Sequence, residues 1–94
     1  MTLLAARNIH SPTPPERIIG RVRALQVSET QIVFRVYDLV HEGAILSYIA
    51  RQVPGSDEVT FFTAGPERTV TEQRYHNINM LMAHIEELAM QHLR

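Results

Sequence analysis

The histidines of the C-terminal segment are the residues whose spacing first suggests chemistry. His76, His84 and His92 recur at intervals of eight residues. In a helix, eight residues rotate a side chain by about 80°, so the three imidazoles would spread over about 160° and could not share one metal ion. These histidines therefore predict no metal site, and we expect no cofactor.

Acids also stand close to histidines in the sequence. Glu72 and His76 stand four residues apart, a spacing that more often gives a plain helix pair than a metal edge. Asp38, His41 and Glu42 fall near one predicted hairpin, where polar residues are common for solubility alone. An enzyme or sensor built around His41 and Glu42 at a dimer cleft stays open as an alternative. Because the sequence has neither a phosphate-binding glycine loop nor a nucleophile elbow, we predict a protein that is not an enzyme.

Arginine is the remaining chemically distinctive residue. All nine basic residues are arginine, and cysteine is absent, which excludes disulfides and thiolate chemistry. Guanidinium groups bind carboxylates and phosphates through planar forks and stack on aromatic rings. The net charge of −1 argues against bulk attraction to nucleic acid. The positions of the arginines therefore matter more than their number.

The elements that must position these arginines are predicted strands rich in Ile, Val, Phe and Tyr. Four segments have this pattern: 18–27, 31–40, 44–53 and 59–63. The third would also suit a short helix. Three-residue loops at 28–30 and 41–43 predict antiparallel hairpins that place Arg23 opposite Arg35 and Val36 opposite Tyr48.

This register separates two faces of the sheet. The predicted inner face collects Ile18, Val22, Ala24, Ile32, Phe34, Val36, Leu46, Tyr48 and Ala50. The predicted outer face collects Arg21, Arg23, Arg35, Arg51, Tyr37 and Ser47, with Ile19, Leu25, Leu39, Ile45 and Ile49 at its rim. Like charges opposite one another destabilise a sheet, so Arg23 beside Arg35 favours an anionic or acidic partner. A change of one residue in the first loop would instead place Arg21 beside Asp38.

The pattern changes to a helical period after Gly65 and Pro66. Thr69 followed by Glu72 is typical of a capping box, which predicts a helix over residues 70–94. One stripe at helical spacing is predicted to be core: Tyr75, Ile78, Leu81, Met82, Ile85, Leu88, Ala89 and His92. A thinner apolar set, Met80, Ala83 and Met90, lies on the other side and is a candidate contact.

Together these segments predict an α+β fold, a four-stranded antiparallel meander packed on one long C-terminal helix. We expect a single domain over residues 16–94, preceded by an extended arm and linker over residues 1–15 that contains three prolines. Leu3, Leu4 and Ile9 are apolar enough for this arm to dock on the domain or on a second copy, with disorder as the alternative.

Function is predicted from the surface that such a fold leaves exposed. We expect a cytoplasmic, non-enzymatic protein-interaction module, acting as an adaptor, inhibitor or regulator without a membrane segment. Self-association as a homodimer is expected through the outer sheet face or the methionine side of the helix. The candidate binding residues are Arg21, Arg23, Arg35, Tyr37, Arg51, Met80 and Met90. The alternative is an RNA- or DNA-binding module that uses the arginines of the sheet.

Overall fold

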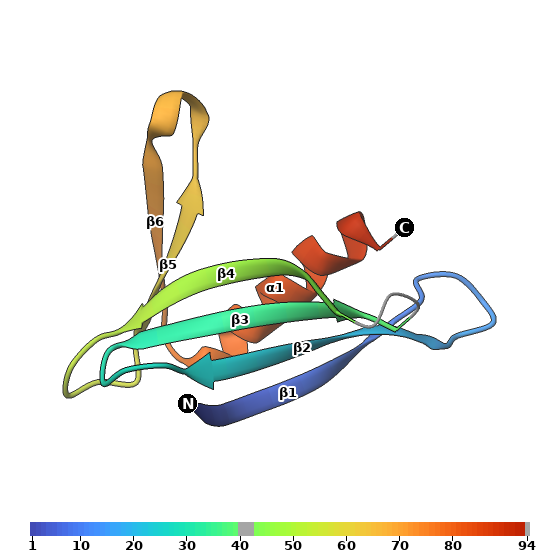
Figure 1. The fold of residues 1–94 in the computed structure, drawn as a ribbon, viewed down its shortest axis with the longest axis horizontal. Helices are drawn as coiled ribbons and strands as arrows, with labels where there is room; N and C mark the ends of the chain where they lie inside the picture. Colours follow the sequence, from blue (N-terminus) through green and yellow to red (C-terminus); the bar gives the residue numbers. More distant parts are fainter. Residues whose placement is uncertain (40–42, 94) are drawn as a thin grey trace.

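The chain folds as an antiparallel sheet with a helix packed against one of its faces (Figure 1). A computed structural model describes residues 1–39 and 43–93. The six strands follow one another across the sheet in sequence order, β1-β2-β3-β4-β5-β6. The elements are β1 (Thr2–His10), β2 (Ile18–Gln26), β3 (Gln31–Asp38), β4 (Gly43–Gln52), β5 (Val59–Ala64), the short 3₁₀ turn η1 (Pro66–Arg68), β6 (Val70–Tyr75) and α1 (Ile78–His92).

The α+β class is confirmed. Each of the four segments predicted as strands contains a strand, and residues 44–52 belong to β4 rather than to a helix. The first hairpin has the predicted register, with Arg23 opposite Arg35 and Val22 opposite Val36. Its loop is closed by the Val27 amide, which donates to the Gln31 carbonyl at 3.0 Å. The β-branched and aromatic residues of these strands fit the half-buried pleated surface.

The predicted register of the second hairpin is wrong by two residues. Val36 lies opposite Leu46 rather than Tyr48, because the pairing ends at Asp38 and Gly43 and a bulge falls between Val36 and Tyr37. A shift of two residues leaves every side chain on its predicted face, since successive side chains alternate. The loop residues His41 and Glu42, and with them any site built there, lie outside the described residues.

The prediction of four strands is wrong because two further strands flank the meander. Residues 2–10, expected as an extended arm, form β1 and pair with β2. Ile9 is 1% exposed and belongs to the core, whereas Leu3 and Leu4, the other apolar residues of the predicted arm, are 55% and 41% exposed. The division into an arm and a domain at residue 15 stays a prediction.

The second added strand replaces the predicted start of the helix. Residues 70–75 pair with β5 as β6, and Thr69 is not the N-cap of a helix: it follows η1, and its hydroxyl donates to the Pro66 carbonyl at 2.7 Å. The helix begins after Asn77, whose side-chain oxygen accepts from the Met80 amide at 3.0 Å. α1 is therefore 15 residues long, and the predicted helix over 70–94 is wrong over its first two turns.

The core lies between α1 and the inner face of the sheet. From α1 it takes Leu81, Met82, Ile85 and Ala89, as the helical stripe predicted. Tyr75 lies in β6 but still packs against this core, as Ile78 and Leu88 of α1 do, whereas His92 is exposed. Gly20 lies where the end of α1 meets β2: a Cβ there would come within 2.7 Å of both a Leu93 methyl and the Tyr37 carbonyl. The outer face of the sheet is the one turned away from α1.

Candidate functional site

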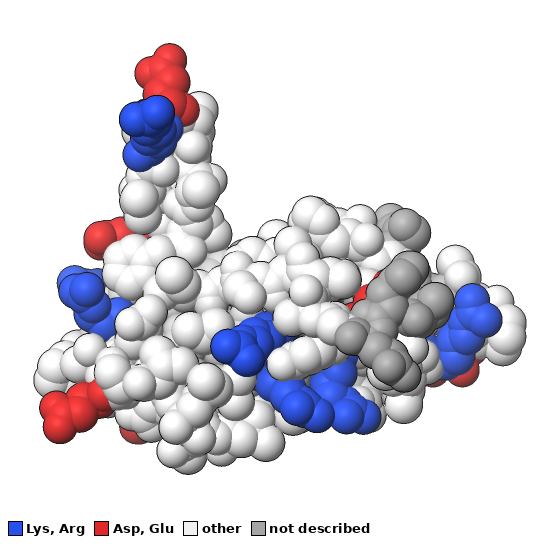
Figure 2. All heavy atoms as spheres, in the orientation of Figure 1, with Lys and Arg blue, Asp and Glu red and all other residues white. Residues whose placement is uncertain are grey.

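The predicted arginine cluster is present on the outer face. Arg21 lies opposite Tyr37, and Arg23 lies opposite Arg35, across the β2–β3 ladder. Figure 2 views this face, with α1 behind it, and shows arginines gathered over the middle of the sheet while most acidic residues lie toward its ends. The ladder therefore places two arginines directly opposite each other, an arrangement that generally destabilises a sheet.

Neutral groups hold two of these arginines in place. The Arg21 Nε donates to the Asn8 Oδ1 at 3.2 Å, from the neighbouring strand β1. The Arg23 guanidinium stands over the Tyr37 ring, with its Cζ 5.3 Å from the ring centroid. Both side chains also line a shallow hollow of about 380 Å³ together with Asp38. A cation held on an aromatic ring keeps its charge and its outer edge available to a partner.

The other predicted binding residues are not part of this cluster. Arg51 lies on the same face near the C-terminal end of β4, where its Cζ is 5.8 Å from the centroid of the Phe62 ring. Met80 is 49% exposed on α1, on the opposite layer of the molecule. Met90 packs against the core. The predicted methionine surface is thus divided, and neither methionine joins the arginines.

An apolar row crosses the outer face between the arginines. Opposite residues on five successive strands form it, and the ladders join them in the order Leu3, Leu25, Val33, Ile49 and Phe62. Leu3 is 55% exposed and Ile49 is 49% exposed. On one side of the row lie Arg23 and Arg35, and on the other side lies Arg51. The face therefore combines an apolar centre with cationic flanks.

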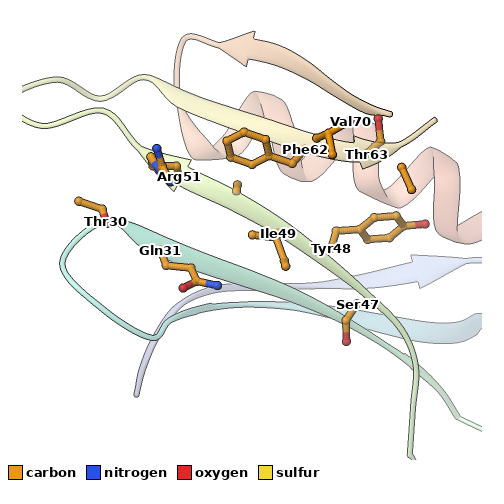
Figure 3. A pocket seen from close by; sticks show the side chains of 11 residues that line it. Thr30, Gln31, Ser47, Tyr48, Ile49, Arg51, Phe62, Thr63 and Val70 are labelled. Atoms are coloured by element: carbon orange, nitrogen blue, oxygen red, sulfur yellow. The ribbon is translucent and has the colours of Figure 1, made fainter. Parts of the chain in front are cut away.

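A groove continues this row at the point where the sheet divides. β5 pairs with β4 from Gln52 back to Ile49, beyond which the β5–β6 hairpin turns away from the body (Figure 1). The resulting groove measures about 720 Å³, and Figure 3 shows Phe62 and Val70 of the hairpin across from Ile49 of β4. Val70 is 65% exposed. We call the place where the hairpin leaves β4, between Ile49, Phe62 and Val70, the fork.

The sequence prediction missed the half of the site that the hairpin supplies. Phe62 and Val33 were assigned no role, and Val70 was placed in the helix. Alternation along residues 59–62 could have identified Phe62, because a strand that buries Val59 and Phe61 must turn Thr60 and Phe62 to the other face. The angle between the hairpin and the body has no comparable signal in the sequence.

Two tyrosines that pack against the core have raised pKa values. Burial raises the pKa of the Tyr48 hydroxyl beside the fork, and burial followed by the charge of Glu87 raises the pKa of Tyr75. Within residues 1–39 and 43–93, no group of three or more His, Asp or Glu side chains could hold a metal ion. In the same residues, no helix has the length and apolar character needed to cross a membrane.

Comparison of the chain with protein-family models, with curated proteins and with solved structures returned no match. The site must therefore be interpreted from its own geometry.

Proposed function

We propose that the chain is a cytoplasmic, non-enzymatic protein-interaction module that binds an acidic, amphipathic helix of a partner protein on its outer face. The observation that supports this most directly is the apolar row with arginines on both sides, ending in the groove at the fork. Exposed Ile49 and Leu3 gain from burial by an apolar surface. Arg23 and Arg35 gain from carboxylates that relieve their mutual repulsion.

The dimensions of the face suit a helix laid across the strands. Five strands at a spacing of about 4.8 Å give a row about 19 Å long, which matches about 13 residues of helix. Successive outward residues on a strand are about 7 Å apart, so Arg23 and Arg35 stand about 7 Å to one side of the apolar row and Arg51 about 7 Å to the other. A helix about 10 Å across would rest on the row and direct its flanking side chains at the guanidinium groups.

Nucleic acid is the second candidate, and one observation favours it. The outer face carries two aromatic rings, Tyr37 and Phe62, each with a guanidinium over it. Single-stranded RNA binds sheets through stacked bases and arginines of this kind. The aliphatic residues of the apolar row, Leu25, Val33 and Ile49, favour an apolar protein surface instead.

A binding assay with two labelled probes separates the candidates. The first probe is a designed peptide of about 14 residues with leucine at helical i, i+3, i+4 and i+7 spacing and glutamate on both flanks. The second is a single-stranded oligouridine. Fluorescence anisotropy is measured for both at low and high salt, with a scrambled peptide of the same composition as the control.

The proposal predicts that the helical peptide binds and the scrambled peptide does not. Phe62→Ala and Arg35→Glu should each weaken peptide binding by about tenfold or more, while Met80→Ala, on the opposite layer, should leave it unchanged. Oligouridine binding that falls steeply with salt, without peptide binding, would establish the nucleic-acid alternative. Failure of both probes to bind would remove the case for the outer face.

A further inference from the structure

The free backbone edge of strand β6 is a second interaction surface, beside the outer face. We propose that two copies of the chain pair their β6 strands antiparallel about a two-fold axis at Gln73, joining two six-stranded sheets into one. β6 ends the sheet, and its residues from Val70 to Arg74 are all exposed. An exposed edge of this kind is a template for another strand.

The direction of the backbone groups fixes which residues of β6 can pair outward. The Gly65 amide donates to the Thr69 carbonyl at 2.8 Å, so these two residues occupy a hydrogen-bonded position of the β5–β6 ladder, while the Thr69 amide donates to the Pro66 carbonyl at 3.1 Å. Such pairs alternate with pairs that are not hydrogen-bonded along an antiparallel ladder. The backbone groups of Val70, Glu72 and Arg74 therefore point away from β5, toward a second strand.

Charge then selects one register from the few that these groups allow. With the axis at Gln73, Glu72 lies opposite Arg74 of the second copy, and Arg74 lies opposite Glu72 of the second copy. A shift by one step in either direction places Glu72 opposite Glu72, or Arg74 opposite Arg74. Opposite charges on facing residues stabilise a strand pair, and like charges destabilise it. The edge is thus complementary to itself in one register.

Glu72 and Arg74 are available for this pairing. Within residues 1–39 and 43–93, the ion-pair contacts are Arg7 with Glu86, at 3.6 Å, and His10 with Glu16, at 3.5 Å. Neither involves β6. Glu72 and Arg74 lie, like Val70, on the face of the sheet that carries Phe62. Both new ion pairs would therefore form on the outer face.

The two edges of the sheet differ in a way that favours β6. β1 has two register shifts, between Leu3 and Ala5 and between Ile9 and His10, and such bulges impair the addition of a strand. β6 runs through six consecutive pairs with β5 without a shift. The regular edge is therefore the one that can accept a second copy along its length.

The hairpin also presents β6 where a second copy can reach it. Figure 1 shows the β5–β6 hairpin standing clear of the body of the sheet. Its base is fixed by a cluster of rings: Tyr75 stacks on His84 of α1 with centroids 5.8 Å apart, and Phe61 meets both of them edge-on. Because the base of the hairpin is held and its edge is unobstructed, less conformational entropy is lost when a second strand pairs with β6.

Charge reversal with rescue tests the proposal. The wild-type chain, Glu72→Arg, Arg74→Glu and the double variant E72R/R74E are measured by light scattering after size exclusion, at micromolar concentration. Circular dichroism verifies that each variant is folded. The two single variants are also mixed, one of them carrying a tag that distinguishes its mass. Arg68→Glu, in the turn at the hairpin tip, is the matched control.

The wild-type chain and the control should have twice the mass of one chain, and each single variant should dissociate at concentrations about tenfold higher than the wild type. The double variant should regain the dimer. The mixed single variants should form a heterodimer, since each then supplies the charge that the other lacks. A monomeric wild type, single variants that remain dimeric, or a mixture without heterodimer would each overturn the proposal. Loss of peptide binding in Phe62→Ala, with the dimer intact, would bear on the outer face alone.

Discussion

Phe61 and Phe62 are neighbours in the chain, but Phe61 lies on the inner face of the sheet and Phe62 on the outer face. Substituting each of them tests which side chains lie on which face. Phe61 is 2% exposed and contacts Tyr48, Tyr75 and His84 through edge-on ring pairs 5.7 to 6.4 Å apart. Phe62 lies on the outer face under the Arg51 guanidinium. Substitution of each by alanine should therefore have different consequences for stability and for binding.

Phe61→Ala removes a fully buried ring and should lower the free energy of unfolding by about 3–5 kcal/mol. For a domain of this size each kcal/mol corresponds to about 4–8 °C in Tm, so the loss should be at least about 12 °C. Phe62→Ala removes a partly exposed ring and a cation–π contact of about 0.5–1 kcal/mol, for a total of about 1–2 kcal/mol. Its main effect should be on partner binding.

Urea denaturation followed by far-ultraviolet circular dichroism measures both values, with Phe61→Leu as a control that should recover about half of the Phe61→Ala loss. A Phe62→Ala cost equal to or above that of Phe61→Ala would refute the reasoning. Such a result would mean that β5 is displaced by one residue against β4, which exchanges the two faces.

Two further predictions concern the start of the helix and alkaline stability. Asn77→Ala removes the N-cap bond to Met80 and should cost about 1 kcal/mol in the urea titration, whereas Thr69→Ala removes one exposed loop bond and should cost less than about 0.5 kcal/mol; the reverse order would place the helix start at Thr69. The pKa of Tyr48 and of Tyr75 is raised from 10.0, so the folded chain holds the phenolic protons more tightly than the unfolded chain does. The free energy of unfolding should therefore be insensitive to these groups below about pH 10 and fall as the pH rises through the folded pKa values, a fall that Tyr48→Phe should reduce and that a flat profile would contradict.

The meander was predictable because its signals are local. Alternation along residues 18–26 and 31–38, with a polar loop between them, determined both the register of Arg23 against Arg35 and the face on which each side chain lies. The buried stripe Leu81, Met82 and Ile85 followed equally from helical spacing. In both cases the spacing of the apolar residues matches the period of the strand or helix, and those residues cover one buried surface.

β6 was not predictable in this way because two signals competed over the same residues. Thr69 and Glu72 fit a capping box, while Val70, Thr71 and Tyr75 favour a strand. Pairing with β5 decides the outcome, and that contact is made by tertiary structure rather than by local preference. β1 was missed for a related reason, since the prolines of residues 11–15 suggested a detached arm while Ile9 beyond them enters the core.

The projecting part of the hairpin has a consequence for how this chain can change over time. Between Phe61 and Leu81 the structure has no fully buried residue, so the turn at the tip of the hairpin, residues 65–69, can be exchanged, shortened or extended without repacking the core. The hairpin tip is therefore a module that selection can modify separately from the domain that carries it. Among related chains, we expect lengths and sequences to diverge most there, while Phe61 and its ring partners at the base stay fixed.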